Sequence, residues 1–221
     1  RNRIIYRNIN VLGVYNMLNK IISCRRVDFL ERKRFFAKGI TDLFLMRVQR
    51  KDIGTYRHIK RVARLSSQIL DFIIRSNFFG VRVSKLEKKI LKRNSNLVRL
   101  AVFLHDLGKL KISNKILNAK RQLNKKQRKI MRRHPRWGVE KVEEIARNLQ
   151  DFQTDKNLQD FIQLAKWANR DHHERWDGNG YPNQLKRAQI SLICRVIAIV
   201  DFFDALRYER PYREAMDRDR V

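Results

Sequence analysis

Apolar residues recur at intervals of three and four along most of this 221-residue chain, and this spacing places them on one face of an α-helix. The segment with Leu158, Phe161, Ala165 and Ala168 is one example. No stretch alternates apolar and polar residues as a half-buried strand does. Three prolines and eight glycines leave few positions that would break a helix. The sequence therefore predicts an all-α fold.

Turn and capping residues divide the chain into its predicted helices. Asp52 and Ser95 stand where two helices are expected to start, and glycines near positions 80 and 108 are expected to end them. The predicted helices lie within residues 52–80, 95–108, 124–134, 139–149, 158–168 and 190–200. Two units are expected: a basic N-terminal helical extension or linker over residues 1–50, and a helical domain over residues 51–221.

The chain is strongly basic, with 51 lysines and arginines against 22 acidic residues and a net charge of +29. Such a charge predicts attraction to polyanions: nucleic acid, an acidic membrane surface or a phosphorylated small molecule. Residues 107–139 contain no Asp or Glu. The lysines and arginines of this segment are Lys109, Lys111, Lys115, Lys120, Arg121, Lys125, Lys126, Arg128, Lys129, Arg132, Arg133 and Arg136. The alternative is a solvated helical face in a chain rich in basic residues. Aromatic residues do not alternate with the cations as a base-stacking platform requires.

The two cysteines, Cys24 and Cys194, lie far apart and form no CxxC pair. They indicate neither a disulfide framework nor a zinc knuckle, so a reducing, cytoplasmic location is expected. The longest apolar run, residues 190–200, is interrupted by Arg195 and is too short to cross a bilayer. The chain opens on Arg rather than Met, so an upstream membrane or sensor region stays an open alternative.

The histidines extend the apolar stripes of the predicted helices. His105 follows Ala101 by four residues, and His172 follows Ala168 by four. The same placement holds for His58 and His134, and His173 is adjacent to His172. A single inward histidine is usually a hydrogen-bonded core residue, but five of them with Asp106 and Asp201 require a compensating cation. Imidazole and carboxylate ligands suit iron, manganese, zinc or nickel.

Several short motifs in this order resemble a known family. The segment His105-Asp106-Leu107-Gly108-Lys109 resembles the HD signature of metal-dependent phosphohydrolases. Four further segments resemble the HD-GYP subclass of cyclic di-GMP phosphodiesterases. They are His134-Pro135, HHERWDGNGYP (172–182), RVIAIVDFFDAL (195–206) and RPYREA (210–215). The resemblance covers about residues 50–221 and implies an HD-type helical bundle that lacks some of the last helices of the family.

The resemblance also implies a set of metal ligands. One divalent ion would be held by His58, His105, Asp106 and Asp201. A second would be held by His134, His172 and His173, with Asp106 between the two ions. Iron and manganese are expected first, with magnesium, zinc and nickel as alternatives. Gly54 stands where some members carry a glutamate for a third ion, so a two-metal centre is expected.

The implied reaction is hydrolysis of cyclic di-GMP to pGpG or on to GMP, by a hydroxide that two metal ions generate. Asp106 and Lys109 are the expected catalytic residues. Lys109, Arg210, Arg213 and Asp204 are expected substrate contacts, although Asp204 also suits capping and packing. The alternatives are a phosphodiesterase for another cyclic dinucleotide or RNA, and a catalytically weak cyclic di-GMP receptor or adaptor.

The loop after the paired histidines supplies no expected catalyst. Gly180, Tyr181 and Pro182 are expected to form a scaffold and a candidate surface for a diguanylate cyclase. Glu174 is expected to orient an imidazole. Gln184 and Arg187 stand where the family usually has glycine, and side chains there are expected to strain the loop.

Overall fold

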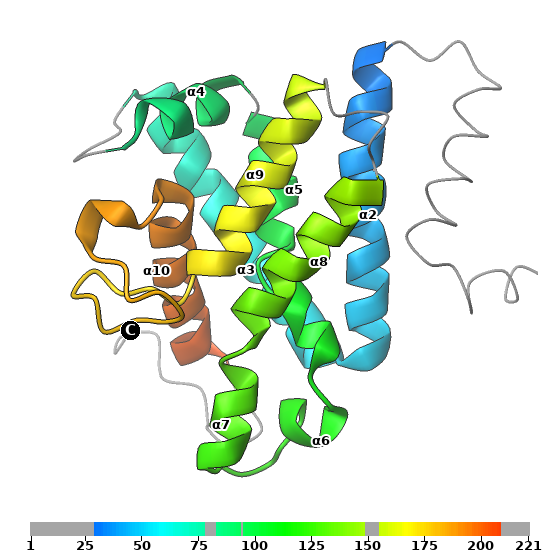
Figure 1. Ribbon diagram of the computed structural model, residues 1–221, viewed down its shortest axis with the longest axis vertical. Helices are drawn as coiled ribbons and strands as arrows, with labels where there is room; N and C mark the ends of the chain where they lie inside the picture. Colours follow the sequence, from blue (N-terminus) through cyan, green and yellow to red (C-terminus); the bar gives the residue numbers. More distant parts are fainter. Residues whose placement is uncertain (1–28, 78–82, 94, 149–154, 209–221) are drawn as a thin grey trace, which may run out of the picture.

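The computed structural model describes residues 29–77, 83–93, 95–148 and 155–208. Within these ranges the regular elements are all helices and no strand occurs, which confirms the all-α prediction (Figure 1). The α-helices are α2 (Phe29–Lys51), α3 (Ile53–Arg75), α4 (Lys85–Arg93), α5 (Ser95–Phe103), α6 (Asn114–Leu117), α7 (Lys125–Met131), α8 (His134–Asn148), α9 (Lys156–Asp171) and α10 (Leu192–Arg207). Two short 3-10 helices are η1 (Leu107–Lys111) and η3 (Arg187–Gln189).

Local capping accounts for several of the observed helix starts. The Asp52 carboxylate accepts hydrogen bonds from the N–H groups of Gly54 and Thr55 and so caps α3. Asn124 and Gln127 form a reciprocal capping box at the start of α7. The predicted helix that ran from 124 to 134 is wrong at its end. α7 stops at Met131, and α8 begins at His134, because a proline in the first turn starts a helix rather than ending one.

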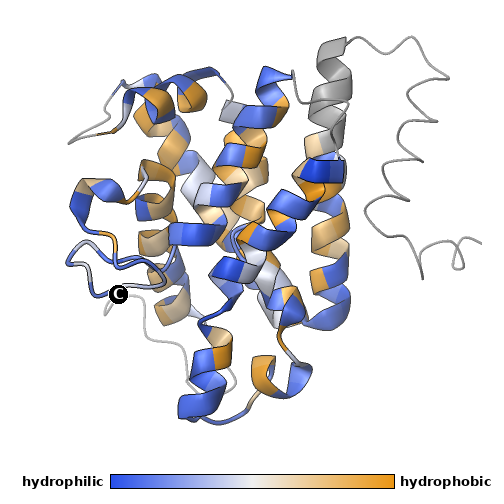
Figure 2. Cartoon of the chain, viewed as in Figure 1, coloured by the Kyte–Doolittle hydropathy of each residue, from blue (hydrophilic) through white to orange (hydrophobic). Residues whose placement is uncertain are grey.

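The bundle has α3 and α5 at its centre, with α9 on α5, α10 on α3, and α8 against both α9 and η1 (Figure 1). Apolar side chains from all of these helices meet in one core, and Figure 2 shows hydrophobic residues, in orange, recurring along the helices of the bundle. Ala37, Phe44 and Val48 of α2 are buried in the same core, and α2 packs on α3 and α5. The boundary expected at residue 50 thus falls between two helices that share a core.

Helices α6 and α7 contact each other at the end of the bundle opposite α4 (Figure 1). We call residues 114–133, which hold both helices and their connection, the basic lobe. Cys194 is buried in α10, and its thiol donates to the carbonyl oxygen of Trp167 at 2.9 Å, whereas Cys24 lies outside the described residues. Among the described helices, none combines the length and the apolar character that crossing a bilayer requires.

Candidate metal centre

The site lies where several helices begin or end. His134 is the first residue of α8, His172 follows the end of α9, and His58 comes from the first half of α3. α5 ends at Phe103, and the backbone then turns, with the N–H groups of Leu104 and His105 bonded three residues back. This turn lets the neighbours His105 and Asp106 face the same centre, although a continuing helix would separate their directions by about 100°.

A glycine permits the closest approach in this arrangement. A Cβ atom on Gly108 would lie 1.9 Å from the carbonyl oxygen of His134 and 2.7 Å from the backbone nitrogen of Gly138. Both neighbours are backbone atoms of α8, so they cannot move aside as the end of a flexible side chain could. Gly108 therefore allows η1 to pack directly on the start of α8, and this packing brings His134 beside His105 and Asp106.

The first cluster consists of His58, His105 and Asp106, each with a ligand atom within 4.8 Å of the others. His105 Nε2 lies 3.3 Å from Asp106 Oδ2, and His58 Nε2 lies 3.8 Å from the same oxygen. Asp201 of α10 joins the cluster, because its Oδ1 is 3.1 Å from His58 Nε2.

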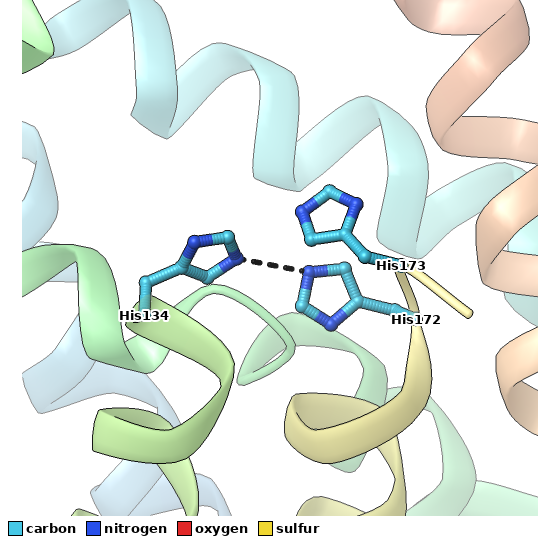
Figure 3. Close-up of side chains that lie close together, drawn as sticks. All are labelled: His134, His172 and His173. Atoms are coloured by element: carbon cyan, nitrogen blue, oxygen red, sulfur yellow. Dashed lines mark hydrogen bonds between the residues drawn. The ribbon is translucent and has the colours of Figure 1, made fainter. Parts of the chain in front are cut away.

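The second cluster consists of His134, His172 and His173, whose ligand atoms also lie within 4.8 Å of one another (Figure 3). Asp106 Oδ1 is 3.4 Å from His134 Nε2 and 3.8 Å from His172 Nε2. Asp106 thus presents one carboxylate oxygen to each cluster. The structure therefore brings together all seven residues expected as metal ligands.

Backbone carbonyls determine which ring nitrogen of three histidines carries the proton. The Nδ1 atoms lie 2.9 Å from Val102 O for His105, 2.7 Å from Met131 O for His134, and 2.8 Å from Ala168 O for His172. Because a carbonyl oxygen can only accept, each neutral ring holds its proton on Nδ1 and directs an Nε2 lone pair to the centre. A metal-binding histidine is usually held in this way.

Two of these lone pairs face each other. His134 Nε2 and His172 Nε2 are 3.2 Å apart, the contact drawn as a dashed line in Figure 3. With both protons on Nδ1, the neutral rings have no hydrogen to share across this gap. The arrangement is favourable only with a cation between the nitrogens or close to both. The donor set thus fits a divalent metal ion.

Burial and local charge maintain the protonation states that ligands need. Burial lowers the pKa of His134 to about 3, that of His173 to about 4, and that of His172 well below its usual value. Burial would raise the pKa of Asp106, but the ammonium of Lys109 and the nearby imidazoles outweigh it and hold that pKa well below its usual range. At neutral pH these imidazoles are neutral and the carboxylate is ionised, as metal binding requires.

Two buried polar atoms of the centre have no hydrogen-bond partner among the described residues. They are His105 Nε2, in the first cluster, and Asp106 Oδ1, which faces the second cluster. An unsatisfied buried acceptor costs on the order of 1–3 kcal/mol, and more when it is charged. A metal ion bound to each cluster would satisfy both atoms, so this observation supports the same donor assignment.

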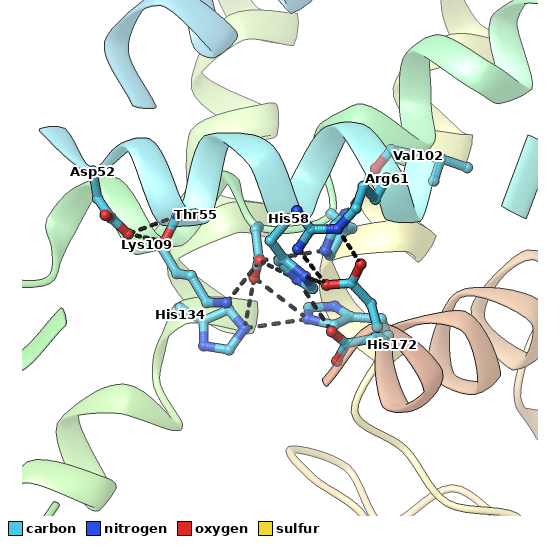
Figure 4. Close-up of polar contacts among 12 residues, drawn as sticks. Asp52, Thr55, His58, Arg61, Val102, Lys109, His134 and His172 are labelled. Carbon is cyan, nitrogen blue, oxygen red and sulfur yellow. Dashed lines mark hydrogen bonds and ion pairs between the residues drawn. The ribbon is translucent and has the colours of Figure 1, made fainter. Parts of the chain in front are cut away.

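Lys109 and Asp106 are in direct contact. Lys109 Nζ lies 2.7 Å from Asp106 Oδ2, and Figure 4 shows the lysine reaching toward the centre from η1. The lysine side chain keeps about a fifth of its surface exposed, 19%, whereas the aspartate is buried. The ammonium therefore lies between the buried carboxylate and the solvent.

Asp204 lies behind His58. Its Oδ2 is 2.7 Å from His58 Nδ1, and the Arg61 guanidinium donates to both carboxylate oxygens at 2.6 and 3.0 Å (Figure 4). These contacts occupy Asp204 and favour its packing role over a substrate contact. Arg61 was missed by the sequence reasoning. The available signal was its position three residues after His58, on the same face of α3.

The loop after His173 is held by Glu174. Its buried carboxylate accepts hydrogen bonds from the N–H groups of Asn183 and Leu185 at 2.6 and 3.0 Å. The expectation that Glu174 orients an imidazole is therefore corrected: its carboxylate accepts from backbone N–H groups of the loop. A Cβ atom on Gly180 would lie 2.5 Å from Glu174 Cα, so Gly180 lets the loop fold back on this residue.

Tyr181 connects the loop to the metal centre. Its ring stacks on the ring of His173, with centroids 4.7 Å apart and an interplanar angle of 23°, while Pro182 beside it is exposed. Gln184 has φ 55° and Arg187 has φ 51°, both in the left-handed region. This finding confirms that side chains stand at two positions that favour glycine. Arg210 and Arg213, the other expected substrate contacts, lie outside the described residues.

Comparison with known proteins gives a family match. The sequence profile of the HD domain matches residues 79–220. The chain is 27% identical over 211 residues to the 3'3'-cGAMP-specific phosphodiesterase 2 of Vibrio cholerae, which is 96% of this chain and 35% of that protein. It is 36% identical over 123 residues to the cyclic di-GMP phosphodiesterase response regulator RpfG of Xanthomonas campestris, which is 56% of this chain and 29% of that protein.

A third relative matches along nearly the whole chain. The chain is 27% identical over 215 residues to a cyclic di-GMP phosphodiesterase of Thermotoga maritima, which is 96% of this chain and 51% of that protein. This chain therefore spans about half or less of the length of these relatives, and their names describe larger proteins.

Proposed function

Because this chain belongs to the HD domain family, we propose that it is a metal-dependent phosphodiesterase that opens cyclic di-GMP to pGpG or on to GMP. The observation that carries the proposal is the position of Asp106, which directs one buried oxygen to each of two imidazole clusters. Relatives named as phosphodiesterases for cyclic dinucleotides support the substrate class.

We assign the ligands of two divalent ions as follows. His58, His105, Asp106 and Asp201 would hold one ion, and His134, His172, His173 and the other oxygen of Asp106 would hold the second. Mixed imidazole and carboxylate sites suit iron or manganese, and also zinc or nickel. When bound, such ions lower the pKa of water toward neutrality and offset the negative charge of a phosphodiester.

The protein contributes fixed metal-binding donors and the ammonium of Lys109 to this chemistry. The carbonyls that hold the Nδ1 protons of His105, His134 and His172 set the ring orientations before any ligand arrives. Lys109 is the residue that we assign to a phosphate oxygen, because its ammonium borders both Asp106 and the solvent. A positive charge held beside the reacting phosphate stabilises the charge that grows in the transition state.

A second candidate substrate is 3'3'-cGAMP, which differs from cyclic di-GMP in one base. It is favoured by the relatives of Vibrio cholerae that are named for it, one of which matches 96% of this chain. In this assignment the metal centre would bind phosphate oxygens rather than bases, so its described residues do not discriminate between the two substrates.

The test combines metal analysis with product chromatography on both cyclic dinucleotides. The Asp106→Asn variant keeps the size of the side chain, and Asp42→Asn removes an exposed carboxylate of α2 as a matched control. We expect two metal ions per chain and a linear product for the wild type and for Asp42→Asn, and loss of both for Asp106→Asn. Binding of cyclic di-GMP without turnover by the metal-loaded wild type would instead identify a receptor.

A further inference from the structure

The basic lobe, residues 114–133, presents a dense set of cations to solvent. The lobe contains no acidic residue, and Figure 2 colours most of α7 and the loop before it as hydrophilic. Its exposed basic residues are Lys115, Lys120, Arg121, Lys125, Lys126, Arg128, Lys129, Arg132 and Arg133. Positive charge is therefore concentrated on the surface of the lobe.

These cations lack acidic partners within the part of the chain that the structure describes. Just outside the lobe, Lys111 and Arg136 both pair with Glu140, at 3.1 and 3.3 Å. No ion pair of the described residues involves a cation of the lobe itself. Like charges packed this closely repel one another within a Debye length of about 8–10 Å, and a bound polyanion would relieve that repulsion.

The apolar side chains of the lobe are turned away from solvent. Leu117, Leu123, Ile130 and Met131 are only partly exposed, and none of the exposed large hydrophobic residues of the described chain lies in the lobe. Proteins that insert into a membrane surface present apolar anchors beside their cations, and this lobe has none. Lysines and arginines without apolar anchors fit the phosphate backbone of a nucleic acid, which is recognised mainly by charge.

The lobe is also in contact with the metal centre. The Arg132 guanidinium lies over the ring of Tyr181, 5.1 Å from its centroid, and the same ring stacks on His173. His134, a member of the second cluster, begins the helix that follows the lobe. A nucleic-acid strand on the lobe would thus run beside the centre.

We propose that the basic lobe binds the phosphate backbone of a nucleic acid. This surface is separate from the ligands of the metal centre, so the proposal does not depend on which cyclic dinucleotide is hydrolysed. Binding by backbone charge is independent of base sequence and falls steeply with salt. For single strands the slope of log K against log salt is about −0.7 for each phosphate contacted.

The test uses a fluorescent single-stranded uridine oligonucleotide with chelator present, so that no metal-dependent cleavage occurs. One variant carries Lys125→Gln and Lys129→Gln in α7. The matched control carries Lys85→Gln and Lys89→Gln in α4, which are also exposed, four residues apart, and located at the opposite end of the bundle (Figure 1). Both variants lose the same charge, and circular dichroism confirms that both remain helical.

Anisotropy titrations at salt concentrations of roughly 50 to 200 mM give the outcome. We expect the α7 variant to reduce the magnitude of the salt slope by about 1.4, for two lost phosphate contacts, and the α4 variant to leave it unchanged. An equal reduction of the salt slope in the two variants would overturn the proposal and indicate diffuse attraction by net charge. Vesicles with phosphatidylserine provide the other test: dependence on Lys125 and Lys129 for vesicles but not for RNA would also overturn it.

Discussion

His58 and Asp204, which are 146 positions apart in the sequence, are joined by a 2.7 Å contact between the ring Nδ1 and a carboxylate oxygen. The guanidinium of Arg61 donates to both oxygens of the same carboxylate, and its Cζ lies 3.6 Å from the centroid of the Tyr208 ring. Asp204 thus fixes the orientation in which His58 Nε2 faces Asp106 and Asp201. A carboxylate behind a histidine ligand also raises the basicity of the ring.

The first prediction concerns this contact. Replacing Asp204 by Asn keeps the shape but removes the charge behind His58, so we expect metal affinity to fall about 10- to 100-fold. Competition with a chromophoric chelator measures the affinity directly, without reference to turnover. Asp42→Asn serves as the control. A variant that unfolds more easily but binds metal as tightly as the wild type would show that Asp204 is only a packing residue.

The second prediction concerns the stability of the metal-free protein between pH 6.5 and 4. The unfolded chain takes up protons on His134, His172 and His173 below about pH 6.5. Burial lowers the pKa of His134 to about 3 and that of His173 to about 4 in the fold, and it lowers the pKa of His172 well below its usual value. The unfolded state therefore binds more protons, and the free energy of unfolding falls as the pH falls. Each ring contributes about 1.4 kcal/mol per pH unit in this window.

The pKa of His58 is shifted in the opposite direction, so this residue does not change the slope of stability against pH below pH 6.5. Burial would lower its pKa, but hydrogen bonds to Asp201 and Asp204 outweigh burial and raise it, so below pH 6.5 the ring is protonated in both states. Urea titrations at several pH values, with chelator present, measure the slope. We expect His173→Gln to reduce it by about one proton. An unfolding free energy that is constant between pH 6.5 and 5 would contradict the assigned burial of these rings.

The third prediction concerns the two left-handed residues of the loop. Gln184→Gly and Arg187→Gly each remove a side chain from a backbone conformation that costs roughly 1–2 kcal/mol for an L-residue. Glycine adds entropy to the unfolded chain, about 0.5–1 kcal/mol, so the net stabilisation should be about 0 to 1.5 kcal/mol for each change.

The control for the loop variants is Asn183→Gly, at a neighbouring exposed position that is not among the residues with positive φ. There the glycine relieves no strain, and we expect a loss of about 0.5–1 kcal/mol. Thermal or urea unfolding compares the three variants with the wild type. If Gln184→Gly and Arg187→Gly destabilise the protein as much as Asn183→Gly does, the left-handed conformation carries no strain.

Much of the centre was accessible from sequence because helical periodicity is local. His105 and His172 extend apolar stripes of their helices, and the structure places both among the most buried side chains. The two strained loop positions came from the resemblance to the HD-GYP family, which usually has glycine where Gln184 and Arg187 stand, and the structure gives both residues positive φ.

Periodicity places a side chain on a face, but it does not say which side chain of another helix it meets. Only the structure shows that Asp204 contacts His58 and Arg61. It also shows that the Glu174 carboxylate accepts hydrogen bonds from the backbone of Asn183 and Leu185 rather than from an imidazole. Both carboxylates pair with groups that become neighbours only when distant segments pack or when a loop folds back. The sequence by itself determined the helices and the inward-facing ligands, whereas the orientation of those ligands depended on contacts that exist only after the helices assemble.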